Sequence, residues 1–373
     1  MILIRNCKLY SPSPQGVKDV LTGGNKILAI GSELKNIQFP EIRELDATGM
    51  MMIPGLIDGH VHIAGAGGEG GPSSRTPELP LQRFIEAGVT TAIGCLGTDG
   101  ITRNPESVLM KVKALRQQGI SAWMYTGSYQ VPTPTILGDV SRDLALIEEI
   151  IGVGEIALSD HRSSYPSTAE LVKLVAQARV GAMLGGKSGV INIHMGDFED
   201  PFRPLYDAAN EGRFSLKQFF PTHCNRNAWI FEDAKAYGKQ GYIDLTASAY
   251  PYFPDDEIKP SCAITGLLKA GVPLEHITLT SDGGGSLPSF DSEGKLVKIE
   301  IGYPASILAE IVDAVRTEGL KTEEAVSVAT VNIANVLKLK SKGRIATGMD
   351  ADLVLLDKDF NVRHVIAMGE IML

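Results

Sequence analysis

The sequence predicts an α/β protein: a (β/α)8 TIM barrel inserted in a small β-sandwich domain that the N- and C-terminal segments form together. Eight short apolar segments alternate with amphipathic segments over residues 56–319, which is the pattern of parallel strands joined by helices. Both ends of the chain consist instead of short apolar runs separated by turn sequences. An open doubly wound sheet is the second choice. It is disfavoured because no Gly-x-Gly-x-x-Gly motif follows a first strand.

The two ends of the chain resemble each other in pattern. Turn sequences near the N-terminus include Ser-Pro-Ser-Pro at 11–14 and Thr-Gly-Gly-Asn at 22–25. Near the C-terminus, residues 348–357 and 362–369 read as two strands joined by a polar turn. We therefore expect residues 1–53 and 340–373 to form the small β domain, with the barrel over residues 54–339. Two unrelated β-extensions would produce the same pattern.

The barrel elements follow one another without a long gap. The predicted strands are 56–63, 89–95, 120–127, 154–159, 190–195, 219–224, 242–248 and 277–281. The predicted helices are 79–87, 106–118, 140–151, 168–180, 202–211, 227–238, 258–270 and 303–319. In the helices over 79–87 and 168–180 apolar residues recur on one face, as Leu171, Leu174 and Val175 do in the second. Catalytic groups of such barrels lie at the C-terminal ends of the strands, so these ends are where a site is expected.

Composition disfavours several classes of partner. The 373-residue chain has a net charge of −9 and shows no basic cluster, so we expect no nucleic acid and no anionic membrane as partner. No apolar run approaches the roughly 20 residues that span a bilayer, and the first residues lack the pattern of a signal peptide. The four cysteines form no Cys-x-x-Cys pair. We expect free thiols in a reducing cytoplasm.

Four of the seven histidines fall at predicted strand ends. His60 and His62 close the first strand and, being two residues apart, project from the same face. His194 and His223 end the fifth and sixth strands. The other three histidines lack this placement. Imidazoles that converge at the mouth of a barrel indicate a metal site.

Two carboxylates complete the candidate donor set. Glu155 lies on the fourth strand, and Asp282 follows the eighth. Four imidazoles and two carboxylates are more than one tetrahedral ion uses, so we expect two divalent ions, with Zn2+ the first choice and Mn, Fe, Co or Ni weaker candidates. Such ions lower the pKa of a shared water toward ~7 and generate a bridging hydroxide. Asp282 can accept the water's proton as general base and return it to the leaving amine as general acid.

These residues resemble the amidohydrolase superfamily over essentially the whole chain. The signs are Pro-Gly-Leu-Ile-Asp-Gly-His-Val-His at 54–62, single histidines on strands five and six, the aspartate after strand eight, and Gly-Met-Asp-Ala-Asp-Leu at 348–353. Within the superfamily, six segments look like the isoaspartyl dipeptidase family. They are residues 65–72, 94–99, 125–129, 159–163, 223–226 and 281–286.

The second resemblance implies a binuclear metallopeptidase that hydrolyses β-aspartyl dipeptides. The catalytic residues that it implies are Asp282, Tyr129, which polarises the scissile carbonyl, and Glu69, which binds the α-amino group. The residues that it implies for substrate binding are Glu69, Gly67, Thr98, Tyr129, Arg162, Arg226 and Ser286. A β-aspartyl dipeptide carries one ammonium and two carboxylates, which one Glu and two Arg match in charge. A homo-oligomer, such as an octamer, is also implied by the resemblance.

One position departs from the family pattern. The family's fourth strand provides a lysine that CO2 carboxylates and that bridges both metals, whereas this chain has Glu155 there and no lysine from Glu148 to Glu170. We expect Glu155 to be the bridge, without a carboxylated lysine. A site with one metal, or with a weakly bound second metal, is the less favoured alternative.

Two other functions stay open. Many substrates are cleaved on this scaffold, so another amidohydrolase acting on cyclic amides or N-acyl amino acids is the first alternative. The second is a non-catalytic assembly protein on a hydrolase scaffold, which is disfavoured because no expected ligand position is lost.

Overall fold

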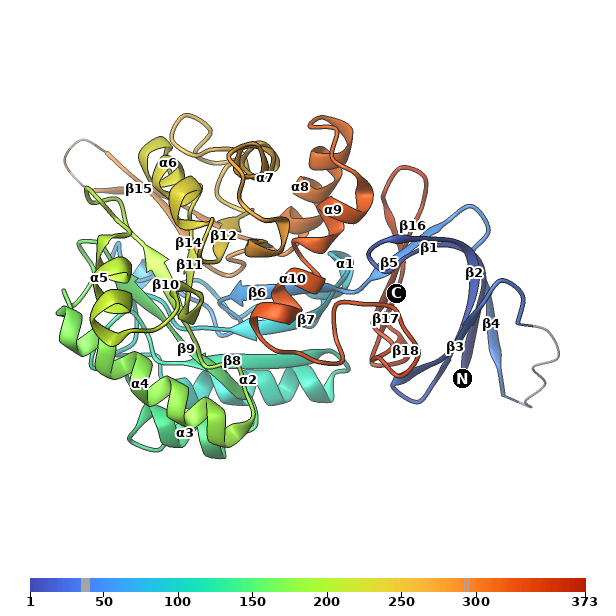
Figure 1. Ribbon diagram of the computed structural model, residues 1–373, viewed down its shortest axis with the longest axis horizontal. Coiled ribbons are helices and arrows are strands. Elements are labelled where there is room, and N and C mark those ends of the chain that lie inside the picture. The colour runs from blue at the N-terminus through green and yellow to red at the C-terminus, as the bar shows by residue number, and fades with distance from the viewer. Residues whose placement is uncertain (35–40, 292, 294) are drawn as a thin grey trace.

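The computed structural model describes residues 1–34, 41–291, 293 and 295–373. Within these ranges the chain forms a barrel, and beside it a second sheet that contains both termini (Figure 1). The barrel occupies the middle of the sequence, and the second sheet is built from its two ends. The predicted fold class is confirmed in both parts.

Eight parallel strands make the barrel wall. They are β6 (Leu56–Val61), β7 (Val89–Gly94), β8 (Ser121–Thr126), β9 (Ile150–Leu158), β10 (Val190–Met195), β11 (Phe219–Thr222), β12 (Ile243–Thr246) and β13 (Ile277–Thr280). The first six pair in sequence order, and β12 pairs with β13. Main-chain hydrogen bonds of 3.1 Å join the two sheets at both seams, from Cys224 N to Asp244 O and from Asp282 N to His60 O. The second seam brings Asp282 next to the histidine pair.

A buried aspartate ties three of these strands together. Asp244 accepts hydrogen bonds from the hydroxyls of Thr222, Thr278 and Thr280 at 2.7, 2.6 and 2.6 Å. These partners stand on β11 and β13, which flank Asp244 on β12. Burial raises the pKa of the Asp244 carboxyl, although all three hydroxyls favour its ionised form. The hydrogen bonds fix the register of the strands that carry His223 and Asp282.

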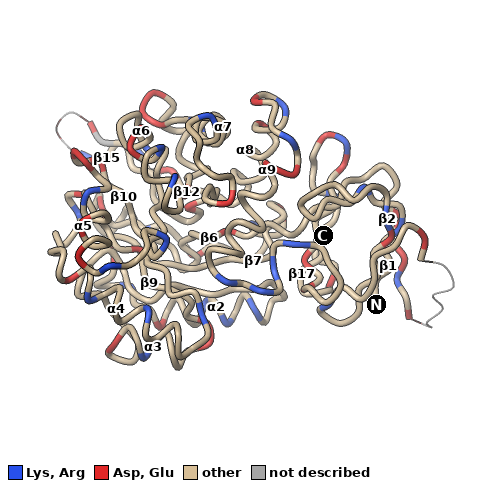
Figure 2. The backbone as a smooth tube through the Cα atoms, in the orientation of Figure 1, with Lys and Arg blue, Asp and Glu red and all other residues tan. Residues whose placement is uncertain are grey.

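Helices cover the outside of the barrel (Figure 1). They are α1 (Leu81–Glu86), α2 (Pro105–Gln117), α3 (Val140–Leu146), α4 (Thr168–Gly185), α5 (Arg203–Gly212), α6 (Ala228–Tyr237), α7 (Pro260–Lys269), α8 (Ala305–Arg316), α9 (Thr322–Ser327) and α10 (Val331–Val336). Helix α4 shows how the sequence sets the ends: a capping box of Ser167 and Glu170 starts it, and Gly186, with φ of 66°, terminates it. Acidic and basic residues are interspersed over these helices (Figure 2).

The structure corrects predicted helix boundaries and adds elements. The helix expected over 168–180 continues to Gly185. The helix expected over 140–151 ends at Leu146, and Ile150 already belongs to β9. Asp143 ties this short helix to the preceding strand and loop, because its side chain accepts hydrogen bonds from Thr126 and from the backbone of Ile136. A hairpin of β14 (Ser286–Phe290) and β15 (Leu296–Ile301), together with α9 and α10, was not expected from the sequence.

The second sheet joins the two ends of the chain. Its strands are β1 (Ile2–Tyr10), β2 (Pro14–Gly23), β3 (Lys26–Gly31), β4 (Arg43–Asp46), β5 (Met51–Pro54), β16 (Leu353–Leu356), β17 (Val362–Ala367) and β18 (Glu370–Ile371). The order is β18-β17-β16-β5-β1-β2-β3, with β4 beside β1. Because β5 pairs with β16, the ends are not unrelated extensions. The sheet curls until Ile27 of β3 exchanges backbone hydrogen bonds with Gly348 and Met349.

A single residue, Gly55, separates β5 of this sheet from β6 of the barrel. The strand that carries the histidine pair is therefore anchored at its start by the terminal sheet. In the part of the chain that the structure describes, no helix is long and apolar enough to cross a bilayer.

Candidate metal centre and substrate pocket

The histidine pair lies at the C-terminal end of β6 and is buried. His60 Nδ1 donates to Asn192 Oδ1 at 2.8 Å, since the amide nitrogen of Asn192 is engaged with Phe220 O. This hydrogen bond fixes the tautomer of His60 and leaves the lone pair of Nε2 facing the barrel centre. Asn192 was not singled out from the sequence.

Glu155 lies within reach of the imidazoles of the cluster, as its distances to the four histidines show. Its side chain is fully buried, and Oε1 has no hydrogen-bond partner in the part of the chain that the structure describes. Four imidazole nitrogens surround its two oxygens: His62 Nε2 lies 3.3 Å from Oε1, and His60 Nε2, His194 Nδ1 and His223 Nε2 lie 3.5, 3.1 and 3.6 Å from Oε2. One carboxylate is thus within reach of every histidine of the predicted donor set.

Asp282 approaches the same imidazoles from the end of β13. Its Oδ1 lies 3.1 Å from His62 Nε2 and 3.5 Å from His60 Nε2, and within the described ranges it too lacks a hydrogen-bond partner. Buried carboxylate oxygens without a partner are costly. Among these contacts His194 Nδ1 and Glu155 Oε2, 3.1 Å apart, form a hydrogen bond; the other oxygens and nitrogens converge at 3.1–3.6 Å without one and leave a place for a cation.

The donor atoms fall into two groups that share Glu155. His60, His62, Cys95 and Glu155 form one group, and Glu155, His194 and His223 form the other. Within each group the donor atoms lie within 4.8 Å of one another. Among the described residues this arrangement is able to hold two ions with a common carboxylate.

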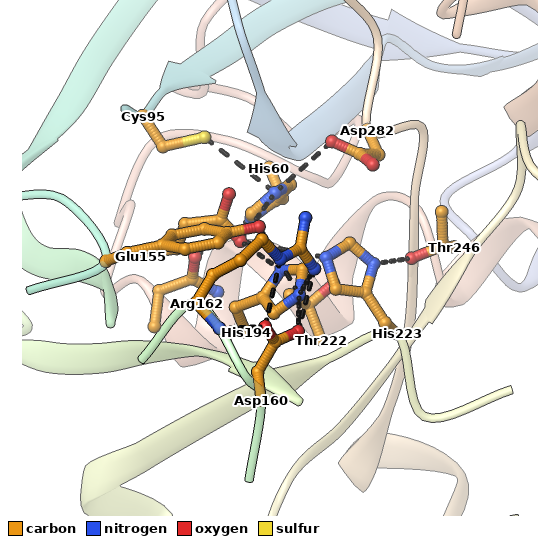
Figure 3. Close-up of polar contacts among 12 residues, drawn as sticks. His60, Cys95, Glu155, Asp160, Arg162, His194, Thr222, His223, Thr246 and Asp282 are labelled. Atoms are coloured by element: carbon orange, nitrogen blue, oxygen red, sulfur yellow. Dashed lines mark hydrogen bonds and ion pairs between the residues drawn. The ribbon is translucent and has the colours of Figure 1, made fainter. Parts of the chain in front are cut away.

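Cys95 was treated from the sequence only as a free thiol. It directly follows β7, and its Sγ lies 3.8 Å from His60 Nε2 (Figure 3). The same sulfur lies 3.7 Å from His62 Nδ1. The sequence does place Cys95 at the C-terminal end of the second barrel strand, and the same criterion identified the histidines. Cys95 could therefore have been predicted as a site residue.

The ionised carboxylates of the cluster give it negative charge that bound cations can neutralise. Burial raises the pKa of Glu155, but His60 and His194 outweigh it and hold that pKa well below the usual range. Asp282 is likewise ionised, since His60 and His62 lower its pKa against the effect of burial. Burial opposes protonation of His60 and His62, yet neighbouring Cys95 and the carboxylates raise the pKa of both rings. Divalent ions neutralise the negative charge of the carboxylates and leave the imidazole rings unprotonated.

His223 is held neutral in the same surroundings. Burial lowers the pKa of its ring to about 3, and His194 adds to the effect. Its Nδ1 is hydrogen-bonded to Thr246 Oγ1 at 2.7 Å, so that Nε2 faces Glu155. A neutral imidazole with one nitrogen anchored is the form in which histidine binds metals.

A cavity of about 640 Å³ opens over the cluster, a size typical of small-molecule sites. The predicted site residues that line it are His62, Glu69, Thr98, Tyr129, Glu155, Arg162, His194, His223, Arg226, Asp282 and Ser286. His60 lies beneath this lining. Gly67 also lies outside it and shapes the loop instead: its φ is 82°, and an added Cβ would meet Ser74 O at 2.3 Å.

The wall of the cavity carries one carboxylate and two guanidiniums. Ser286 Oγ donates to Glu69 Oε2 at 3.0 Å, and Arg162 Nη1 lies 3.7 Å from Glu69 Oε1. Asp160 binds Arg162 in bidentate fashion, with distances of 2.9 and 2.7 Å, and lies 3.7 Å from Arg226 Nη1. Despite burial, Arg162 and His194 hold the pKa of Asp160 far below its usual range. Asp160 orients both arginines and was not identified from the sequence.

Tyr129 closes one side of the centre. Its hydroxyl lies 2.8 Å from His194 Nδ1, and the Arg162 guanidinium lies 5.3 Å from its ring centroid. The side chain is buried, and burial raises the phenol pKa well above its ordinary value. Tyr129 therefore stays protonated and is able to donate a hydrogen bond into the cavity.

Comparisons with known proteins agree with this geometry. A model described as the amidohydrolase family matches residues 254–372. The beta-aspartyl dipeptidase of Fervidobacterium islandicum AW-1, solved in complex with beta-Asp-Leu, is 42% identical, with a TM-score of 0.93 over 100% of this chain and 96% of that chain. The allantoinase of Enterococcus faecalis is 22% identical over 95% of this chain and 86% of its own length. A dihydropyrimidinase of Brevibacillus agri shares the fold, with 15% identity and a TM-score of 0.69 over 100% of this chain and 94% of that chain.

The similarity to the dihydropyrimidinase, at 15% identity, supports the fold alone. The similarity to the beta-aspartyl dipeptidase spans almost the whole of both chains, and the family model covers the C-terminal third, where Asp282 and the strands that close the terminal sheet lie. With the converging histidines and carboxylates at the strand ends, these findings identify the chain as a member of the amidohydrolase family.

Proposed function

We propose that this protein is a binuclear metal-dependent dipeptidase that hydrolyses the β-aspartyl peptide bond. The observation that carries the proposal is one cavity that combines the shared carboxylate Glu155 at its floor with Glu69, Arg162 and Arg226 on its wall. A β-aspartyl dipeptide has one ammonium and two carboxylates, so its charges complement this wall. The 42% identity to a dipeptidase solved with beta-Asp-Leu supports the same substrate class.

The residues of the two donor groups fit a pair of divalent ions. His60, His62 and Glu155 would hold the first ion, with Asp282 beside it, and Glu155, His194 and His223 would hold the second. The unpartnered Oε1 of Glu155 supports its role as the shared ligand. Imidazole and carboxylate donors favour zinc among the abundant divalent metals. When bound, such ions lower the pKa of a water toward ~7 and polarise a carbonyl group.

The protein's own groups divide the proton transfers between them. Asp282, ionised and facing the centre, accepts a proton from the attacking water as general base and passes it to the leaving amine as general acid. Tyr129 keeps its proton and donates a hydrogen bond to the oxygen of the scissile carbonyl, where negative charge develops. Both residues line the cavity.

Substrate charges are matched by groups held in fixed positions. Glu69, steadied by Ser286, binds the α-ammonium of the aspartyl residue. Arg162 and Arg226, which Asp160 orients, bind the two carboxylates. Thr98 contributes a hydroxyl that lines the cavity and has no hydrogen-bond partner among the described residues, and Gly67 shapes the loop that carries Glu69.

We also propose that the protein works in the cytoplasm as a homo-oligomer, with an octamer as the expected assembly. The four cysteines, all described by the structure, are free thiols, which suits a reducing compartment. Light scattering coupled to size-exclusion chromatography tests the assembly, and a monomer at micromolar concentration would contradict it.

A substrate panel tests the reaction. Release of leucine from β-Asp-Leu is compared with release from α-Asp-Leu and from N-acetyl-leucine, and with ring opening of dihydroorotate and of a hydantoin. We expect efficient hydrolysis of β-Asp-Leu alone, about two zinc ions per chain, and loss of turnover in Asp282→Asn. Activity confined to the cyclic amides would establish the alternative amidohydrolase reading, and a metal-free protein without any turnover would favour a non-catalytic role.

A further inference from the structure

Strand register places Cys95 against the histidine pair. The residue follows Gly94, the last residue of β7, and its backbone N–H donates to Val61 O at 3.1 Å. Val61 is the residue between His60 and His62, so the hydrogen bond sets the thiol beside both rings. Its side chain is fully buried. The position of the sulfur is therefore set by the barrel wall rather than by a loop.

The thiol of Cys95 differs from the other buried thiols in its partners. Cys7 donates to Lys18 O and Cys224 donates to Pro221 O, at 3.1 and 3.4 Å. Such carbonyl partners are what a thiol in a protein interior finds. The polar contacts that the structure gives Cys95 are two imidazole nitrogens, at 3.8 and 3.7 Å. Two imidazole nitrogens and one buried sulfur are donor atoms that can surround a single metal ion.

The spacing fits tetrahedral coordination. Zinc binds thiolate sulfur at about 2.3 Å and imidazole nitrogen at about 2.0–2.1 Å, so two ligands of one tetrahedral ion stand roughly 3.6 Å apart. Cys95 Sγ and His60 Nε2 are separated by 3.8 Å, and Glu155 Oε2 is 3.5 Å from the same nitrogen. The second, independent sign of a ligand is Glu155 Oε1, which is fully buried and has no hydrogen-bond partner among the residues that the structure describes. Cys95 belongs to the first donor group and is absent from the second.

We propose that Cys95 binds the first metal ion as a thiolate, together with His60, His62 and Glu155. This inference rests on the proposed function, because it assumes that the centre holds metal. Four protein donors then complete a tetrahedral first site. The second site, which has three protein donors, keeps a position open for water, which is the pattern of a catalytic site.

Two chemical consequences follow. A thiolate ligand favours zinc or cobalt over manganese or magnesium in the first site. Asp282, whose Oδ1 reaches the same imidazoles, is no longer needed as a ligand there. Its carboxylate is then free to take up and deliver the proton during hydrolysis.

Cobalt substitution tests the proposal on the whole protein. The metal is removed with a chelator, Co2+ is added alone, and bound cobalt is measured by elemental analysis before the absorption spectrum is recorded. We expect a near-ultraviolet sulfur-to-cobalt charge-transfer band in the wild type. Cys95→Ser should lose the band and bind the tighter cobalt ion at least roughly tenfold more weakly, because an oxygen replaces the soft ligand. Cys7→Ala and Cys262→Ser, which remove one buried and one exposed thiol away from the centre, should keep the band.

The outcomes separate this proposal from the proposed function. Wild-type protein that holds cobalt and hydrolyses β-Asp-Leu but shows no charge-transfer band would refute ligation by Cys95 and leave the dipeptidase assignment standing. A band that survives in Cys95→Ser would also refute it. Protein that neither binds metal nor cleaves the dipeptide would refute the proposed function instead. If Cys95→Ser does not fold, X-ray absorption of the zinc-loaded wild type decides, with a sulfur neighbour at about 2.3 Å as the expected result.

Discussion

Replacing the shared carboxylate should disable the centre more than any other single change. In Glu155→Gln the shape of the side chain is kept, but its charge is lost and one oxygen becomes an amide nitrogen. Four imidazole nitrogens lie within 3.1–3.6 Å of that carboxylate. Removing one member of a buried charge cluster costs about 3–5 kcal/mol. If that energy is lost from the active state, kcat/KM falls roughly 10²- to 10⁴-fold.

Metal content and turnover are measured on the same preparation of the variant. We expect bound zinc to fall from about two ions to one or fewer per chain, and leucine release from β-Asp-Leu to fall in parallel. Glu148→Gln is the matched control, because Glu148 precedes the same strand but its side chain is 82% exposed, in an ion pair with Arg116. A Glu155→Gln protein that keeps two ions and wild-type kcat/KM would refute the bridging role, and a wild type that needs added bicarbonate would point to another bridge.

Three other changes have expected outcomes. Tyr129→Phe removes the hydroxyl that lies 2.8 Å from His194 Nδ1; kcat should fall by roughly 10²- to 10³-fold with little change in KM, as steady-state kinetics on β-Asp-Leu will show. Arg162→Met removes a guanidinium that faces the cavity, so KM for β-Asp-Leu should rise by about tenfold or more. Arg203→Met is the control: Arg203 forms an exposed ion pair with Asp207 on α5, and its loss should leave KM unchanged. Glu257 lines the cavity, and burial raises its pKa to about 8. Because its folded pKa lies above the unfolded value of about 4.3, its contribution to stability is full below pH ~4.3 and is lost as the pH rises through 8. The Tm of Glu257→Gln relative to wild type should therefore increase from pH 5 to pH 9, and a difference that is flat with pH would contradict the shifted pKa.

The barrel strands could be predicted from the sequence because each is a short apolar run between turn residues. The boundary between α3 and β9 could not, because Val140, Leu144, Ile147 and Ile151 recur at helical spacing. All four do meet the core, but Ile151 does so from strand β9. The β14–β15 hairpin was hidden by Pro288, which argues against a central strand and is tolerated in this antiparallel pair.

In the candidate site, too, some residues could be predicted from the sequence and others could not. Histidines and carboxylates at strand ends carry their chemistry in their identity and spacing, so His60 and His62 stand out in the sequence. Cys95 does not, because a lone cysteine is most often a small apolar residue of the core. Asp160 is hidden for another reason: its contact with two arginines depends on a loop in which Ser159 has a φ of 55°, and no local pattern predicts that conformation.

Part of the stability that the fold loses through unmade hydrogen bonds is lost at the site. Nine buried side-chain atoms lack a hydrogen-bond partner among the residues that the structure describes. Four of them, on Thr98, Glu155, Glu257 and Asp282, line the cavity. Each unmade hydrogen bond costs about 1–3 kcal/mol of folding free energy. Apolar side chains at these positions would avoid that cost. That these atoms gather where ions and a charged dipeptide are proposed to bind indicates that their missing partners are the ligands, so binding should stabilise the folded chain as well as position the substrate.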